Sequence, residues 1–467
     1  MKIAFVIPNA REVIRTIPLG PLYLTSYLRS QGYHDISIID SRHQRLTHTA
    51  LSRRIKDLSP DVLGISGMSM EFAEVHSIAG LAKEINGNCT VIVGGPYATS
   101  SPEHILKDPN VDFLVIGEGE RTTARLINAL QKGNDVSEVE GIAFKNNQNC
   151  AINPPQPAIE DLDAIPFPAW DLIDIEGYFK DIHNHSQTPI PTSPRIVPLF
   201  TSRGCPYRCT YCHNIFGKKI RFRSVENVME ESEALVKRYR VQEIEVVDDC
   251  FNFDLPRAKE ICDEIISRGI KIALSFPNGL RVDRMDEELI VKLKQAGTRV
   301  IFYAIESASP RIQKVIKKNL DLDKARHIIA WTIKQDIVTC GYFMLGFPGE
   351  TRQEMLQTLR FAKDAGFHIA DFFYLIPQPS TEIFGELERK NVKLKKIGIN
   401  VYHKLSTNAS SLSDRELKRM QAKSFREFYF RPRQMWRIWR IIPDKTRILE
   451  KAFMVLLHSV ADRYQTT

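Results

Sequence analysis

The stretch Gly204-Cys-Pro-Tyr-Arg-Cys-Thr-Tyr-Cys-His-Asn214 places three cysteines, Cys205, Cys209 and Cys212, within eight residues. A short apolar run at residues 197–201 precedes it, so the cysteines are expected in a loop that follows a strand. Three thiolates this close in sequence suit one soft metal centre. A cluster of four irons needs four ligands, so three cysteines would leave one iron open to a substrate.

A zinc site built from the three cysteines and His213 is the alternative. His213 directly follows Cys212, so the two side chains are poorly placed to reach one tetrahedral ion, and no second pair of ligands at zinc spacing occurs elsewhere. The other cysteines are scattered singly, at positions 89, 150, 250, 262 and 340. This distribution favours a reducing compartment with one metal site over a disulfide framework.

Beyond the cysteine loop, apolar runs alternate with helical patterns. The predicted strands are residues 197–201, 243–247, 271–276, 299–305, 338–345 and 371–376. The helix expected directly after the loop, over residues 225–239, shows apolar side chains at helical spacing along one face. Six strand–helix units predict an incomplete (β/α)6 barrel, in which the chemistry lies at the carboxyl ends of the strands.

The first 150 residues show a separate alternation. The predicted strands are residues 3–7, 36–39, 62–65, 91–93 and 113–116, and the predicted helices are residues 22–30, 46–58, 74–85 and 122–130. This order predicts an α/β, doubly wound (Rossmann-like) parallel sheet that binds its ligand at the carboxyl edge of the strands. We expect four segments: a first domain over 1–150, a proline-rich linker over 151–195, the barrel over 196–395, and a basic helical region over 396–467.

The composition is that of a soluble globular protein, with 43% hydrophobic and 26% charged residues among 467. No run approaches the ~18 apolar residues that a membrane span needs. The apolar stretch at the N-terminus is too short for a signal peptide. We therefore expect a cytoplasmic protein.

The pattern C-x3-C-x2-C, with an aromatic residue before the last cysteine, resembles the motif of the radical S-adenosylmethionine (radical SAM) superfamily. The resemblance implies that Cys205, Cys209 and Cys212 hold a [4Fe–4S] cluster whose open iron is chelated by S-adenosylmethionine. An electron from the cluster then cleaves the sulfonium and gives a radical that abstracts hydrogen. The resemblance also implies an electron donor such as flavodoxin or ferredoxin.

Polar residues at several predicted strand ends fit the same resemblance. Tyr211 occupies the position that lies beside the adenine in the family, Glu306 is implied to accept from the ammonium of S-adenosylmethionine, and Arg281 to grip its carboxylate. Asp249 and Gly346 complete the implied set. Taken singly, each is equally consistent with a helix cap or a surface ion pair. Their common placement at strand ends favours the binding role.

The N-terminal half resembles the cobalamin-binding domain that is fused to many radical SAM enzymes, at residues 18–24, 64–69, 94–96 and 117–120. The implied cobalamin contacts are Ser66, Ser69, Gly94 and Gly95. The two glycines let a ligand approach the backbone closely, and the two hydroxyls supply hydrogen-bond donors.

One departure from the cobalamin motif concerns the residue below cobalt. The motif has aspartate, any residue, histidine, and a glycine three residues further on, whereas here the strand end reads Asp40-Ser-Arg-His-Gln-Arg45. Arg42 occupies the histidine position, and His43 is displaced by one residue, which turns its side chain away. Either the domain binds cobalamin without a protein histidine below cobalt, or it has lost the cofactor. We expect binding without histidine.

Basic and aromatic residues interleave between positions 415 and 447, with Trp436 and Trp439 among them. Such a segment suits a peripheral contact with an anionic membrane. It equally suits a helical cap that packs on the barrel and keeps a solvated basic face. No nucleic acid is expected, because no separate binding motif accompanies the patch.

The sequence therefore predicts a radical SAM enzyme that reductively cleaves S-adenosylmethionine to modify an unactivated carbon of a small-molecule or lipid-like substrate. Cobalamin-dependent methyl transfer is the leading expectation. A non-methylating oxidoreductase or cyclase is the alternative, and a non-catalytic metal-binding module is the least favoured.

Overall fold

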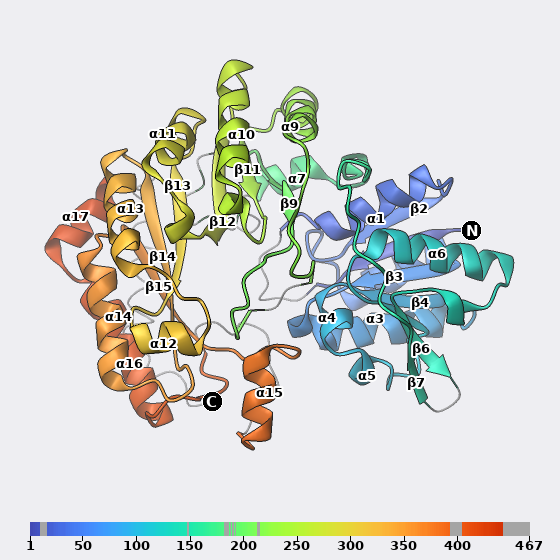
Figure 1. Ribbon diagram of the computed structural model, residues 1–467. Helices are drawn as coiled ribbons and strands as arrows, with labels where there is room; N and C mark the ends of the chain where they lie inside the picture. Colours follow the sequence, from blue (N-terminus) through green and yellow to red (C-terminus); the bar gives the residue numbers. More distant parts are fainter. Residues whose placement is uncertain are drawn as a thin grey trace. The chain divides into compact units, whose positions relative to one another are not determined.

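The computed structural model describes residues 1–9, 16–146, 149–181, 186, 188, 191, 193–212, 215–392 and 404–441. These residues form two compact units, each drawn in Figure 1. Unit 1 consists of the described residues up to 186 together with residues 215–224. Unit 2 consists of the described residues of 188–212 and those from 225 onward.

Unit 1 is built on a seven-stranded sheet in the order β2-β1-β3-β4-β5-β6-β7. The strands are β1 (Ile3–Ile7), β2 (Ile36–Asp40), β3 (Val62–Ser66), β4 (Thr90–Gly94), β5 (Phe113–Val115), β6 (Ile142–Asn146) and β7 (Asn149–Ile152). The first five pair in parallel and the last two antiparallel. The five predicted strands are confirmed, and the strand order reverses at β1 and β3, where doubly wound sheets bind ligands.

Helices cover both faces of this sheet. The helical elements are α1 (Leu19–Ser30), α2 (His48–Leu58), η1 (Ser69–Glu71), α3 (Phe72–Ile85), α4 (Pro96–Ser100), α5 (Pro102–Ile105), α6 (Gly119–Lys132) and η2 (Val136–Glu138). Helices α2 and α3 pack on one apolar core and α1 and α6 on the other. Helix α1 begins three residues before the predicted start, because Pro21 is tolerated in a first helical turn.

The proline-rich stretch after residue 152 packs as part of unit 1. It contains η3 (Trp170–Leu172) and α7 (Ile175–Lys180). Ile165 and Trp170 are buried, as expected for an ordered segment. The short strand β10 (Arg221–Phe222) also belongs to unit 1.

Unit 2 contains an all-parallel sheet in the order β15-β14-β13-β12-β11-β8. The strands are β8 (Ile196–Leu199), β11 (Glu243–Val246), β12 (Ala273–Leu280), β13 (Val300–Glu306), β14 (Val338–Leu345) and β15 (Ile369–Tyr374), with a short β9 (Ser202–Arg203) after β8. The helical elements between them are α9 (Val225–Tyr239), η4 (Phe251–Phe253), α10 (Leu255–Ser267), η5 (Val282–Arg284), α11 (Glu287–Gln295), α12 (Pro310–Val315), α13 (Leu322–Lys334) and α14 (Arg352–Asp364). The six predicted strands and the helix after the cysteine loop are confirmed.

The sheet of unit 2 has an outer face under helices and an inner face. Tyr303 points outward and its hydroxyl bonds with Thr332 of α13 at 2.7 Å. Phe372 of the edge strand β15 packs outward on Phe425 and Phe428 of α16 (Asp414–Tyr429), which covers this edge. Because side chains alternate along a strand, their neighbours in sequence face inward.

The C-terminal helices of the described chain are mainly packing elements. Helix α16 buries its apolar face, so this part of the basic region is a cap on the barrel. Helix α17 (Pro432–Ile441) places Ile438 and Ile441 on the apolar cluster of Val300, Phe302 and Cys340 at the amino end of the inner face. Helix α15 (Glu382–Arg389) lies between β15 and α16 in sequence. None of the described helices has the length and apolarity that a membrane crossing requires.

Candidate functional site

The cysteine loop follows β8 and β9 at the carboxyl edge of the unit 2 sheet and is held from two sides. The backbone N–H of Thr210 donates to Ile316 O at 3.1 Å, and its carbonyl accepts from Ile383 N at 3.0 Å. The N–H of Cys212 donates to Cys209 O at 3.2 Å, which closes a turn between two of the cysteines. The loop that carries the thiols is therefore fixed by the segment after α12 and by α15.

The three thiols interact electrostatically with one another. Burial raises the pKa of Cys209, with a further contribution from Cys205. Loss of solvent around the thiol raises the pKa of Cys212 to about 12, and Cys209 and Cys205 add to this. Among the described residues no three His, Cys, Asp or Glu side chains meet as ligands of a single ion. An iron–sulfur cluster does not need three side chains that converge on a single ion, because each cysteine binds a different iron. Three neighbouring thiols on one loop fit that donor set.

His213, the fourth ligand in the zinc alternative, lies outside the described residues. A fourth cysteine lies close by instead: Cys250, after β11, is buried, and its side chain hydrogen-bonds with that of Cys205. The spacing of Cys250 in the sequence gave no signal of this contact.

Tyr211 is at the centre of a buried polar group at the ends of β13 and α12. Its hydroxyl donates to Glu306 Oε1 at 3.2 Å, and Lys318 Nζ donates to the same Oε1 at 2.9 Å and to the Tyr211 hydroxyl at 3.3 Å. Glu306 has a positive φ of 66° beside a register shift between β13 and β14. Such a bulge re-aims a side chain, and strain of this kind is concentrated at functional sites. The sequence pointed to Tyr211 and Glu306, which the structure brings together, but gave no sign of Lys318 beside them.

Arg281, at the end of β12, is already held in place. Its Nε lies 2.9 Å from Asp283 Oδ1, its Nη2 donates to Lys318 O at 2.7 Å, and its guanidinium stacks on the ring of Tyr207 at 3.8 Å. These contacts hold the cation beside the cysteine loop, where it lowers the pKa of Cys209 against the larger effect of burial.

Two neighbouring aspartates after β11 have different environments. Asp248 is buried and accepts from Thr201 N at 2.6 Å and from the Ser202 hydroxyl at 2.7 Å, so it anchors the strand that leads to the cysteines. Asp249, the residue named from the sequence, is exposed, and its charge helps to raise the pKa of Cys212, after burial and the other two cysteines.

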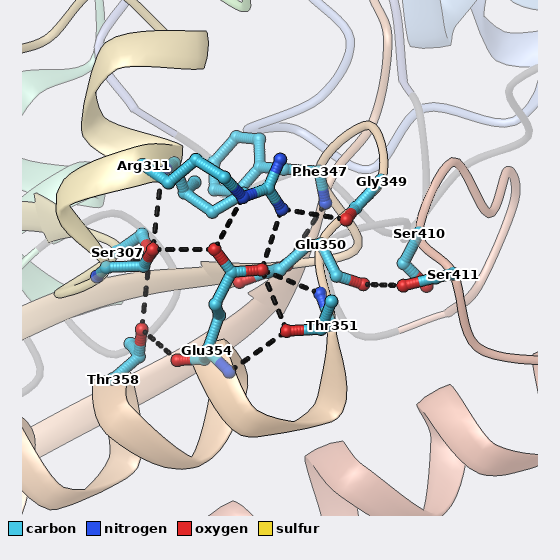
Figure 2. A network of polar contacts seen from close by, with 12 residues as sticks. Ser307, Arg311, Phe347, Gly349, Glu350, Thr351, Glu354, Thr358, Ser410 and Ser411 are labelled. Carbon is cyan, nitrogen blue, oxygen red and sulfur yellow. Dashed lines mark hydrogen bonds and ion pairs between the residues drawn. The ribbon is translucent and has the colours of Figure 1, made fainter.

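Gly346, after β14, has a φ of 101° that disfavours any side chain. It begins a tight turn around the buried carboxylate of Glu350, whose surroundings are drawn in Figure 2. Glu350 Oε2 accepts from Gly346 N at 2.8 Å and from Phe347 N at 3.2 Å. Its Oε1 is buried without a hydrogen-bond partner. Burial raises the pKa of Glu350 to about 8. Ser411 closes the turn from outside by donating to Glu350 O at 2.8 Å.

A second acidic residue ties the ends of β13 and β14 together (Figure 2). Glu354 accepts from Arg311 Nε at 2.8 Å, from Arg311 Nη2 at 2.7 Å, and from the Ser309 hydroxyl at 2.8 Å. Arg311 also donates to Gly349 O at 2.8 Å. The hydrogen bonds from Arg311 lower the pKa of Glu354 to about 2, so this carboxylate stays charged throughout the physiological range.

In unit 1 the four residues assigned to cobalamin lie at the carboxyl edge of β3 and β4. Gly94 and Ser66 are register partners, and Ser69 bonds with the hydroxyl of Ser100 at 3.1 Å. Gly95 has a φ of 85°, and a Cβ there would lie 3.0 Å from Gly67 O. The two loops approach so closely that only glycine fits at position 95, and Gly67 N donates to Gly94 O across this approach at 3.3 Å.

The residues at and beside the position where the cobalamin motif has histidine make contacts within unit 1. Arg42 is buried and forms an ion pair with Glu71, and its Nε donates to Pro8 O at 3.3 Å. His43 stacks on Tyr178 with ring centroids 3.9 Å apart, and the Tyr178 hydroxyl donates to Asp40. His43 therefore packs against α7, and Arg42 takes the histidine position as half of a buried ion pair. Sequence reasoning missed Tyr178.

A second buried ion pair lies in unit 1. Glu118, after β5, accepts from Arg221 Nη1 at 3.0 Å and from Ile159 N at 2.8 Å, and its other oxygen lies 2.6 Å from Arg221 Nη2 in the ion pair. The side chains of Glu118 and Arg221 are 7% and 2% exposed. The segment that follows the cysteine loop in sequence is thus fixed to the same sheet edge as Gly94 and Gly95.

Comparisons with known proteins agree with this arrangement. A model of the Radical SAM superfamily matches residues 199–362, and one of the B12 binding domain matches residues 14–127. The chain is 33% identical over 447 residues to an uncharacterized methyltransferase of Pyrococcus horikoshii, with 93% of each chain covered. It is 31% identical over 422 residues to cytidylyl-2-hydroxyethylphosphonate methyltransferase of Streptomyces wedmorensis, covering 80% of this chain and 78% of that one.

Solved structures show the same fold. The radical S-adenosylmethionine methyltransferase TsrM from Kitasatospora setae matches with a TM-score of 0.71 at 18% identity, covering 84% of this chain and 76% of that one. The cobalamin-dependent S-adenosylmethionine radical enzyme OxsB matches with a TM-score of 0.72 at 19% identity, covering 98% of this chain and 75% of that one. The fold class predicted from the sequence is confirmed. On these matches the chain is an enzyme that belongs to the radical SAM superfamily and carries a B12 binding domain ahead of its radical SAM domain.

Proposed function

We propose that the protein is a cobalamin-dependent methyltransferase that reductively cleaves S-adenosylmethionine and methylates an unactivated carbon of a small molecule. The observation that carries the proposal is the buried group of Tyr211, Glu306 and Lys318 at the strand ends of unit 2, whose charges act on the thiols of Cys209 and Cys212. The B12 binding domain favours methyl transfer over other radical chemistry. Two relatives that are named methyltransferases, and that match 93% and 80% of this chain, favour it as well.

Cys205, Cys209 and Cys212 would hold the cluster. When bound, the [4Fe–4S] cluster supplies the electron that cleaves S-adenosylmethionine, and cobalamin supplies the methyl group. The thiols are fixed by backbone contacts of Thr210 on both sides of the loop, so the donor set is preorganised.

The chain's own residues bind S-adenosylmethionine by charge and shape. Tyr211 packs on the apolar cluster that contains Phe347, which offers a flat surface for the adenine. Glu306 supplies a carboxylate for the ammonium group, and Arg281 a guanidinium for the carboxylate. Lys318 forms an ion pair with Glu306 at 2.9 Å, so the two buried side chains balance each other's charge. Asp249 and Gly346 complete the proposed set.

Ser66, Ser69, Gly94 and Gly95 are proposed to contact cobalamin at the carboxyl edge of the unit 1 sheet. The close approach at Gly95 supports this placement, because the glycine keeps a side chain away from this edge of the sheet. The stacking of His43 on Tyr178 supports binding without a protein histidine below cobalt.

The proposed partners are an electron donor such as flavodoxin or ferredoxin and, through a peripheral contact, an anionic membrane. The proposed location is the cytoplasm. The membrane contact is supported by helix α17 and its start. Of the seven strongly exposed large apolar side chains among the described residues, four lie here: Phe430, Met435, Trp436 and Trp439. Arg440 stacks on Trp436, so cations accompany the exposed rings.

The experiment is anaerobic turnover with S-adenosylmethionine that carries a trideuterated methyl group, followed by mass spectrometry of the product. Methyl transfer predicts a product that gains the labelled methyl. A product altered without label would instead support the oxidoreductase or cyclase alternative, for which relatives named anaerobic magnesium-protoporphyrin IX monomethyl ester cyclase exist at 27% identity.

The cluster assignment has its own controls. Alanine at Cys205, Cys209 or Cys212 should abolish cleavage of S-adenosylmethionine and reduce bound iron. The matched replacements at Cys89, Cys150, Cys250, Cys262 and Cys340 should leave the iron content at four per chain. Retention of full iron and full cleavage after Cys209→Ala would show that the cluster lies elsewhere.

A further inference from the structure

Cys250 is a buried cysteine outside the C-x3-C-x2-C motif, and the proposed function gives it no role. It lies between β11 and η4, it is 4% exposed, and its side chain hydrogen-bonds with that of Cys205. Cys205 follows β8 and β9, and β8 pairs in parallel with β11, so the two cysteines come from neighbouring strand ends. A second thiol is therefore in direct contact with a proposed ligand of the cluster.

The segment that carries Cys250 is held on both sides of the thiol. Before it, Asn278 Nδ2 donates to Val247 O at 2.7 Å. After it, Asn252 Nδ2 donates to Arg281 O at 2.8 Å, and Asn252 Oδ1 accepts from Arg281 N at 3.2 Å. These hydrogen bonds join the segment to the carboxyl end of β12. The fold thus fixes the backbone on each side of the Cys250 thiol.

A buried carboxylate joins the same segment to the strand that leads to Cys205. Asp248, two residues before Cys250, accepts from Thr201 N at 2.6 Å and from the Ser202 hydroxyl at 2.7 Å. Asp248 is itself buried. The contact between the two thiols is therefore built from both sides, and it does not depend on one flexible side chain.

Ligation decides which of the two thiols donates the hydrogen bond. A cysteine that binds iron has lost its proton, so the sulfur of Cys205 can only accept. Cys250 lies outside the motif and is buried, and a buried thiol keeps its proton at neutral pH. The S–H group of Cys250 is then the donor. Hydrogen bonds to the cysteine sulfurs are one of the features that set the reduction potential of an iron–sulfur cluster.

We infer that Cys250 donates a hydrogen bond to the sulfur of Cys205 in the loaded enzyme and thereby makes the cluster easier to reduce. This inference rests on the proposed function, because it takes Cys205 as a ligand of the cluster. Reduction adds one electron from the electron donor and moves no proton, so the ligand sulfurs share the added negative charge. An S–H dipole that points at one of these sulfurs stabilises the reduced state more than the oxidised state. Cys250 acts through Cys205 and is a positioning residue.

Two substitutions separate the hydrogen bond from the packing of the side chain. Cys250→Ala removes the donor, whereas Cys250→Ser keeps one, so the two variants differ by a single hydroxyl. The matched control is Cys262→Ala, which removes another buried thiol, on helix α10. Each variant is the full chain, reconstituted anaerobically with isotopically enriched iron, sulfide and cobalamin.

Mössbauer spectra at a series of solution potentials give the midpoint potential and the iron content together, since only iron contributes to them. Cys250→Ala should lower the equilibrium constant for reduction by about tenfold, which is about 59 mV for one electron. Cys250→Ser should recover most of this shift, and Cys262→Ala should match wild type. All three variants should keep the iron content of wild type.

Three results would overturn the inference and leave the proposed function standing. The first is an unchanged potential in Cys250→Ala. The second is an equal shift in Cys250→Ala and Cys250→Ser, which would assign the effect to packing. The third is a loss of iron in Cys250→Ala, because Cys250 would then be a ligand of the cluster. A wild-type chain that binds no four-iron cluster would overturn the inference and the proposed function together.

Discussion

Replacing Glu350 by glutamine removes a carboxyl group whose ionisation costs free energy in the folded protein, because the group is buried. The carboxyl is fully buried, with one oxygen held by the N–H groups of Gly346 and Phe347 and the other without a partner. Burial raises its pKa from 4.5 to about 8. Folding therefore takes up a proton between these two pH values. The stability from this group is fully present below about pH 4.5 and is lost as the pH rises through about 8.

The size of the effect follows from the two pKa values. Each pH unit between them corresponds to about 1.4 kcal/mol, so wild type should lose about 4 kcal/mol from this one group between pH 5 and pH 8.5. Glu350→Gln keeps an oxygen for the two N–H groups and cannot ionise. Its free energy of unfolding should therefore fall by about 4 kcal/mol less than that of wild type over the same interval.

The assay is guanidinium unfolding at pH 5, 6, 7 and 8.5, followed by circular dichroism. The comparison is the slope with pH, because the amide changes the absolute stability at every pH. Glu354→Gln is the contrasting variant, since the pKa of Glu354 is lowered to about 2 and its titration lies below the tested range. Equal slopes in wild type and Glu350→Gln would refute the assignment of a proton to this carboxyl at neutral pH.

Four further predictions are independent of this one. Cys209→Ala should lose the visible absorbance of the reconstituted cluster, together with all cleavage of S-adenosylmethionine. Arg42→Met should destabilise unit 1 by about 3–5 kcal/mol in urea unfolding, because its buried carboxylate partner is left uncompensated. His43→Ala should leave the absorption spectrum of bound cobalamin unchanged, whereas a shift would show that this imidazole reaches cobalt. Alanine at both Trp436 and Trp439 should weaken flotation with anionic liposomes at low salt, and equal binding of wild type to neutral liposomes would contradict an electrostatic contact.

The sequence predicted what local patterns encode. The strand over 338–345 was predicted to the residue, because its apolar run is long and bounded by turn residues on both sides. The antiparallel pair β6 and β7 was missed, because short half-exposed edge strands carry little apolar periodicity. The start of β15 was predicted two residues late, since Ile369 and Ala370 are fixed by pairing with β14, which the local sequence does not show.

The candidate site also divides into residues that a local motif indicates and residues that only the tertiary fold brings together. The cysteine loop, Tyr211 and Glu306 were predicted from a motif and from strand ends, and the structure brings Tyr211 and Glu306 into hydrogen-bond contact. Lys318 was missed because it reaches Glu306 from a turn between residues with positive φ, a tertiary contact with no local signal. Asp248 and Asp249 differ by one position, and which of them is buried depends on β11 ending at Val246.

The ion pair between Glu118 and Arg221 means that the two units cannot be separated as consecutive lengths of gene. Arg221 lies beyond the cysteine loop in the chain, yet it belongs to unit 1. A fragment that ends before residue 195 would lack Arg221 and would leave the buried carboxylate of Glu118 without its ion-pair partner. An engineered exchange of the B12 binding domain would therefore have to replace residues 215–224, inside the other half of the chain, at the same time.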